Sequence, residues 1–187
     1  MSDDASTNGQ DGSAPSEASL LRHGNQEGRS AQQVLTFHLA GEEYGLGIRN
    51  IQEIRGWTAV TCIPHAPPWV LGVLDLRGSI VPVIDLRRRF GLESAQFGPS
   101  TVLIVIRVTG GAVERNFGLV VDAVSEVYDI SPSHCRALPE LGSEVARSFV
   151  DSLATIDGKT VILLDARRLA ETLHTGRQPQ AAQARPS

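Results

Sequence analysis

The chain has little of what a small secreted or membrane protein needs. Its 187 residues include two cysteines, Cys62 and Cys135, too few for the several disulfides that stabilise small secreted domains. Its longest apolar runs, such as residues 101–106, are far shorter than the roughly 20 residues of a membrane-spanning helix. No basic segment followed by an apolar one opens the chain, so no signal peptide is expected. We therefore expect a cytoplasmic protein that does not insert into a membrane.

Positive charge is also scarce. The chain has 17 Lys and Arg against 21 Asp and Glu, and Lys159 is its single lysine. Nucleic-acid binding depends largely on Lys and Arg that neutralise phosphates, so this acidic balance argues against a nucleic-acid partner. The run of three arginines at residues 87–89 is interpreted as the solvated face of a short helix.

Motifs of enzyme chemistry are missing. The sequence contains neither a Gly-x-Ser-x-Gly elbow nor a P-loop, and no complete dinucleotide fingerprint. Cys62-x-x-His65 and His134-Cys135 supply four possible zinc ligands. Adjacent residues on a strand point to opposite faces, however, which argues against a shared metal at the second pair. We expect no catalytic residue, no metal and no cofactor.

The two ends of the chain differ in composition from the body. Residues 1–30 contain no aromatic residue, Val or Ile, and residues 176–187 consist mostly of Gln, Ala, Pro and Arg. Such segments cannot bury enough apolar surface to offset the entropy lost on ordering, so we expect both to be disordered. The body, residues 31–175, is long enough to form a stable core without disulfides or metals.

Short β-like runs dominate the body. Strands are predicted at residues 34–39, 78–84, 101–108, 117–121 and 160–164. The run at 101–108, apolar from Val102 to Ile106, predicts a strand buried on both faces, whereas Pro82 suggests an edge strand or a bulge. Helical turns are predicted at 48–54, 85–90 and 165–174, the last two with an Asp N-cap. The predicted class is all-β with short helices.

An internal repeat divides this body. Residues 44–54 match residues 117–127 at seven of eleven positions, and residues 76–88 resemble residues 156–168 in the same order. We expect two similar β units, about residues 33–97 and 98–175, with an apolar shared face and a binding groove between them. The repeat is asymmetric at Arg77, whose counterpart is Asp157, and this difference suggests a task performed by one half only.

Six motifs then occur in order: Glu43-Tyr44-Gly45, Ile51–Gly56, Ile63–Pro68, Gly72–Gly78, Ile80–Leu86 and Gly118–Val124. In composition and spacing they resemble the CheW family of bacterial chemotaxis coupling proteins, over about residues 33–175. The resemblance implies two five-stranded SH3-like β-barrels side by side. It also implies a non-catalytic adaptor, without cofactor, that links the cytoplasmic tip of methyl-accepting chemoreceptors to the histidine kinase CheA in membrane-associated arrays.

Two alternatives stay open at this point. A coupling protein of another chemosensory pathway, serving pilus motility or gene regulation, would share the same fold. A small β-barrel module that binds a ligand or nucleic acid is the other alternative.

The resemblance also assigns residues to partners. It implies that a receptor hairpin lies in the groove, lined or supported by Ile51, Glu53, Arg77, Val102, Val124 and Val127. It further implies that the regulatory domain of the kinase packs near Ile48 on one barrel and near Arg136 and Leu141 on the other. We expect an ion pair between Glu53 and Arg77 to orient the polar rim of the groove.

Overall fold

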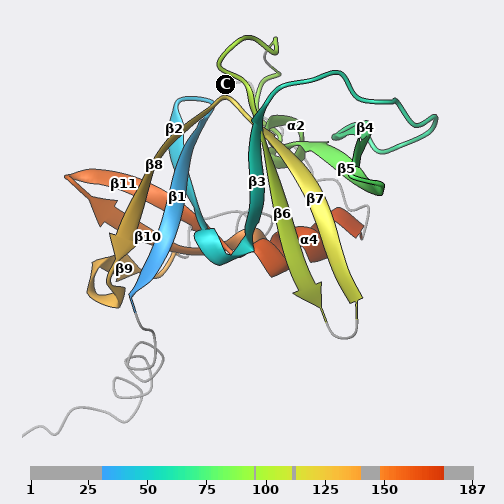
Figure 1. The fold of residues 1–187 in the computed structure, drawn as a ribbon. Coiled ribbons are helices and arrows are strands. Elements are labelled where there is room, and N and C mark those ends of the chain that lie inside the picture. Colours follow the sequence, from blue (N-terminus) through green and yellow to red (C-terminus); the bar gives the residue numbers. More distant parts are fainter. Residues whose placement is uncertain (1–30, 95, 111–112, 140–147, 175–187) are drawn as a thin grey trace, which may run out of the picture. The chain divides into compact units, whose positions relative to one another are not determined.

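The strands form two sheets (Figure 1), in a computed structural model that describes residues 31–94, 96–110, 113–139 and 148–174. Sheet A has the order β8 (Ala123–Ile130), β1 (Gln32–Leu39), β2 (Glu42–Gly47), β11 (Lys159–Leu164), β10 (Val150–Ile156) and β9 (Cys135–Arg136). Sheet B has the order β3 (Ile51–Gly56), β6 (Val102–Gly110), β7 (Val113–Val121), β5 (Ser79–Asp85) and β4 (Val70–Leu76).

In the described part of the chain, short helical elements lie between strands, and one, α4, follows the last strand. They are η1 (Ile48–Asn50), α2 (Leu86–Phe90), η2 (Pro132–His134) and α4 (Ala166–His174). The Asp N-caps predicted for two of them are confirmed, because Asp85 accepts the Arg88 amide at 3.2 Å and Asp165 accepts the Arg168 amide at 3.0 Å. The helix predicted at 48–54 is wrong beyond Asn50: residues 51–56 pair with β6 instead.

Each sheet takes strands from both copies of the repeat. The repeat relates strands β1, β2, β3, β4 and β5 to β6, β7, β8, β10 and β11. Replacing each strand of sheet B by its counterpart in the other copy gives the strand order of sheet A, apart from β9. The first two strands of each copy thus join the sheet that holds the later strands of the other copy. The expected division at residues 33–97 and 98–175 therefore does not coincide with the sheets, because the chain crosses from one sheet to the other after β2 and again after β7.

The strand registers follow the repeat residue by residue. Gly45 on β2 pairs in parallel with Leu163 on β11, and its counterpart Gly118 on β7 pairs with Val83 on β5. The edge strands β8 and β3 each contain a register shift, and the two shifts lie at equivalent positions of the repeat. The shift in β8 lies opposite Thr36, and the shift in β3 lies at Gln52. The two sheets are built on one plan.

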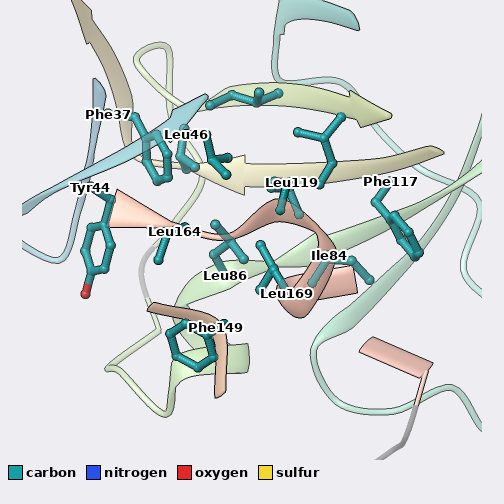
Figure 2. Packing of buried hydrophobic residues seen from close by; sticks show 14 of the residues in the cluster. Phe37, Tyr44, Leu46, Ile84, Leu86, Phe117, Leu119, Phe149, Leu164 and Leu169 are labelled. Carbon is teal, nitrogen blue, oxygen red and sulfur yellow. The ribbon is translucent and has the colours of Figure 1, made fainter. Parts of the chain in front are cut away.

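A central hydrophobic cluster joins the two sheets (Figure 2). It contains Phe37, Leu46 and Leu164 of sheet A, Ile84, Phe117 and Leu119 of sheet B, Leu86 of α2, and Leu169 of α4. Smaller clusters lie on the opposite face of each sheet. Strand β6 contributes Ile104 to the central cluster and Leu103 to that of sheet B, so the prediction of a strand buried on both faces is confirmed.

Pro82 does not mark an edge. It lies in β5, which has β4 on one side and β7 on the other. Pro82 pairs with Val73 of β4, whereas the pairing with β7 begins only at Val83. A residue without a backbone N–H is tolerated inside this sheet because it stands just before the second ladder starts.

An ion pair braces the crossing from β7 to β8. The Nε of Arg87 donates to Oδ1 of Asp122 at 2.7 Å and its Nη2 donates to Oδ2 at 2.5 Å, while the Ala40 amide donates to Oδ2 at 2.7 Å. Partial burial pushes the pKa of Asp122 upward, but the hydrogen bonds from Arg87 and Ala40 outweigh it and hold that pKa below its usual range. The same hydrogen bond raises the pKa of Arg87.

Two glycines permit the parallel pairings. A Cβ on Gly45 would lie 2.6 Å from Cγ1 of Val34 and 2.9 Å from Cδ2 of Leu163. A Cβ on Gly118 would lie 2.9 Å from Cδ1 of Leu103, its other close neighbours being at 3.4 Å or more. Both positions are buried, so any added atom must displace core side chains.

We predict that Gly45→Ala destabilises the protein by roughly 1–3 kcal/mol and more than Gly118→Ala does, because it overpacks the core more severely. Urea unfolding of the two variants measures the difference. Gly98→Ala is the control, since a Cβ there meets nothing within 4 Å. Equal losses for Gly45→Ala and Gly98→Ala would contradict the account of packing.

We predict that Asp122→Asn lowers the free energy of unfolding at pH 7 by about 1.5–3 kcal/mol, the range for hydrogen bonds to charged groups. Because the folded-state pKa of Asp122 is depressed, its stabilisation is complete above the unfolded pKa of about 4 and is lost as the pH falls through the folded value. The difference between wild type and variant should therefore shrink below about pH 4. A difference that stays constant into acid would argue against the ion pair as its source.

Candidate functional site

The predicted receptor-binding residues separate into an apolar group and a charged group. Ile51, Val102 and Val124 are half-buried and pack against the central cluster, and Val127 is 46% exposed. We call these four residues, together with Ile54, the apolar rim. They lie on β3 and β6 of sheet B and on β8 of sheet A. The space between the sheets is filled by the protein's own side chains, so a guest can contact this rim without entering the core.

Ile54 is the member of the rim that the sequence analysis missed. Its side chain is 45% exposed, nearly the same fraction as that of Val127, its counterpart in the repeat. Ile54 pairs with Ile104 just as Val127 pairs with Leu35, and both of these partners belong to the central cluster. The repeat itself carried the signal, because it aligns Ile54 with a residue already assigned to the site.

Glu53 and Arg77 come together in a hollow of about 200 Å³. Its lining belongs to sheet B and the β4–β5 turn: Gln52, Glu53, Leu76, Arg77, Ser79, Val81, Val105 and Asn116. Glu53 pairs with Val105, whose side chain packs in the cluster on the other face of sheet B. Strand β3 thus presents apolar residues toward the rim and polar residues toward the hollow. The polar members Gln52, Ser79 and Asn116 were missed: Gln52 lies inside the Ile51–Gly56 motif but was assigned no role, and Ser79 and Asn116 lie outside the motifs.

The expected ion pair between Glu53 and Arg77 is not formed. Oε1 of Glu53 lies 3.9 Å from Nη1 of Arg55, its neighbour two residues along β3. Within the part of the chain that the structure describes, no carboxylate lies within 4.0 Å of the Arg77 guanidinium. The prediction was wrong because it inferred a contact from sequence motifs, whereas β3 places a closer arginine beside the carboxylate. Arg77 remains available to an acidic group of a partner.

The backbone of Arg77 adopts an unfavourable conformation. Arg77 and Gly78 connect β4 to β5 with φ angles of 54° and 84°, and Asp157 and Gly158 connect β10 to β11 with 49° and 78°. Asp is among the residues that tolerate this left-handed region, whereas for Arg it is strained. The Gly78 amide donates to Oδ1 of Asp75 at 2.7 Å, which holds the turn. A strained arginine at the mouth of a hollow indicates a functional role for its side chain.

The residues assigned to the kinase lie on other elements. Ile48 is half-buried in η1, where the chain crosses between the sheets. Arg136 is exposed on β9, which pairs with β10 in sheet A. Leu141 lies outside the described residues.

The remaining candidate chemistry is sparse. In the ranges that the structure describes, no three His, Cys, Asp or Glu side chains are grouped as a metal site would require. Cys62 is an exposed free thiol, whereas the thiol of Cys135 is half-buried and donates to the Ser131 carbonyl oxygen at 3.8 Å. No described helix has the length and the apolar character needed to cross a membrane.

Comparison with known proteins gives consistent matches. The family model of the CheW-like domain matches residues 33–174. The chemotaxis protein CheW of Rhizobium meliloti (strain 1021) is 35% identical over 134 residues, which cover 72% of this chain and 84% of that protein. The chemotaxis protein CheW of Klebsiella aerogenes is 38% identical over 138 residues, which cover 74% of this chain and 81% of that protein.

A solved structure is also similar. The scaffolding protein TtCheW from Thermoanaerobacter tengcongensis matches with a TM-score of 0.69 and 31% sequence identity, covering 80% of this chain and 98% of that one. The predicted fold class, mainly β with two SH3-like barrel subdomains, is confirmed by this likeness. Sheet A differs from the expected five strands by the two-residue β9.

We predict that Arg77→Asn raises the free energy of unfolding by about 0.5–1 kcal/mol, because Asn tolerates a positive φ better than Arg does. Urea unfolding provides the measurement. The matched control is Asp157→Asn at the equivalent turn, where both residues suit the backbone and no change is expected. A stability loss in Arg77→Asn would show that the arginine side chain contributes to folding instead.

Proposed function

Because this chain belongs to the CheW family, we propose that it is a non-catalytic adaptor that couples chemoreceptors to the histidine kinase CheA in chemotaxis signalling arrays. In this proposal the protein works in the cytoplasm and reaches the membrane through its partners. It binds the cytoplasmic tip of the receptors on one surface and the regulatory domain of the kinase on another.

The observation that carries the receptor proposal is the arrangement along β3. The strand presents Ile51 and Ile54 at the apolar rim, and it presents Glu53 to the hollow that contains Arg77. A helical hairpin has an apolar stripe and charged flanks, so it can place the stripe on the rim and an acidic side chain against Arg77. One guest then uses both groups of residues.

The proposed kinase surface uses other elements than the receptor surface, although Ile48 adjoins the rim, since the Ile51 amide donates to the Ile48 carbonyl. Ile48 on η1 and Arg136 on β9 lie on elements that contribute nothing to the hollow or to the rim, and Leu141 completes the assignment. An adaptor with two surfaces can hold both partners at once. Contacts that are individually weak then give stable assemblies, because each partner raises the effective concentration of the other.

We predict that Arg77→Asp weakens binding to a purified receptor hairpin about tenfold or more without lowering the melting temperature, since Asp suits the positive φ of this turn better than Arg does. The reason is that Arg77 is exposed and makes no ion pair among the described residues, so its charge serves the partner rather than the fold. Co-sedimentation with receptor-containing membranes, with and without the kinase, measures the binding.

The matched control is Arg167→Asp, the same charge change at an exposed position in the first turn of α4. It should leave receptor binding unchanged. If Arg77→Asp lowered stability and binding together, or if both variants bound equally well, the assignment of Arg77 to the receptor surface would be wrong.

A further inference from the structure

The apolar rim has the same pattern on the two sheets. Ile51 and Ile54 on β3 correspond by the repeat to Val124 and Val127 on β8. In each pair the first residue packs against the central cluster and the second is exposed by nearly the same fraction. Because the strand exchange is reciprocal, turning the molecule so that the sheets change places presents these two pairs again, although Val102 of the rim has the polar Gln33 as its counterpart. Apolar contacts are not directional, so the rim alone would accept an antiparallel pair of helices in two opposite directions.

The charges beside the rim are not equivalent. The eight residues of the hollow in sheet B include one carboxylate, on Glu53, and one guanidinium, on Arg77. Their eight counterparts in sheet A include three carboxylates, on Glu43, Glu126 and Asp157, and one ammonium group. The difference is largest at the turns, where a positive side chain in one sheet replaces a negative side chain in the other.

Those three carboxylates lie close enough together to act on one group. Together with burial, which has the largest effect, Glu126, Glu43 and Asp157 all raise the pKa of Tyr128 on β8. Three carboxylates against the single ammonium group of Lys159 leave the region around the β10–β11 turn negative in net charge, at the position equivalent to Arg77 in the other sheet. An acidic segment of a bound guest is therefore attracted by the turn that contains Arg77 and repelled by the turn that contains Asp157.

The backbone shows which of the two turns is the exception. Both turns have positive φ at their first central residue, and Asp157 suits that conformation whereas Arg77 does not. Local stability alone would place Asp, Asn or Gly at both positions. The arginine in the sheet B turn thus departs from the locally favoured residue, as expected where the charge serves binding.

We infer that Arg77 and Asp157 act as an opposed pair that determines the direction in which a receptor hairpin lies on the apolar rim. Arg77 attracts the acidic end of the hairpin, and Asp157 excludes that end from the equivalent place on sheet A. This inference rests on the proposed receptor-binding function. It adds Asp157, through repulsion of the reversed guest, to the residues that determine specificity.

The test measures direction separately from affinity. A nitroxide is attached to Cys62, which is exposed next to Thr61, the residue that bridges to β4, after Cys135→Ser removes the second thiol. A second nitroxide is placed at one end or at the other end of a purified chemoreceptor hairpin. Pulsed electron spin resonance then gives the distance from the sheet B side to each end.

In the wild type we expect one distance for each end of the hairpin. Asp157→Arg should add a second distance that corresponds to the reversed guest, with the overall affinity kept within about threefold. The double variant Arg77→Asp/Asp157→Arg should bind mainly in reverse and exchange the two distances. A directional preference of about tenfold, roughly 1.4 kcal/mol, suffices for these changes to be visible.

Asp157→Asn removes the negative charge without straining the turn. It replaces Asp157→Arg in the distance measurement if the arginine variant fails to fold. It should also add the reversed distance, with a smaller population. If Asp157→Arg and Asp157→Asn both keep a single distance, or if the double variant keeps the wild-type distances, the inference is wrong although the receptor-binding proposal stands. If the wild type does not bind the hairpin, the proposed function itself is wrong.

Discussion

Two parallel strand pairings hold this molecule together: β2 with β11 and β5 with β7. Each joins the early strands of one repeat copy to the late strands of the other, so neither copy can complete a sheet without its partner. At each pairing a buried glycine, Gly45 or Gly118, leaves room for core side chains that a Cβ would displace. Because the exchange is reciprocal, the two sheets bury a common face, and the largest hydrophobic cluster contains residues from both sheets.

The position of the binding surface follows from this exchange. The chain crosses between the sheets just before β3 and just before β8, so both strands lie at sheet edges. An edge strand is accessible on its unpaired side, and the register shift in each strand brings residues three positions apart to the same face. The central cluster consequently ends at two half-exposed apolar pairs. The bond between Arg87 and Asp122 braces one of these crossings, which links the stability of the fold to the placement of Val124.

A nearly symmetric scaffold serves an adaptor that must treat two partners differently. Duplication supplies two barrels and a common core, but equal surfaces would not distinguish one partner, or one direction, from another. The chain departs from its own repeat at surface positions such as Arg77 and Asp157, whereas most paired core positions keep their apolar character, an exception being the buried Arg89, whose counterpart is Leu169. The proposed specificity uses exposed charges, which change at little cost in stability.

The sequence by itself determined the class, the repeat, the family and several elements. Alternation and β-branched runs predicted the strands at 34–39, 101–108 and 160–164, and the Asp N-caps predicted α2 and α4, because these signals depend on neighbours a few residues away. It also assigned Glu53 and Arg77 to one proposed site, and both residues line the same hollow. Only the tertiary structure decided that the strands are exchanged, that Glu53 faces Arg55 rather than Arg77, and that Ile54 is exposed. These features depend on contacts between residues distant in the chain, since strand pairing and edge position follow from how the sheets assemble and not from local preference.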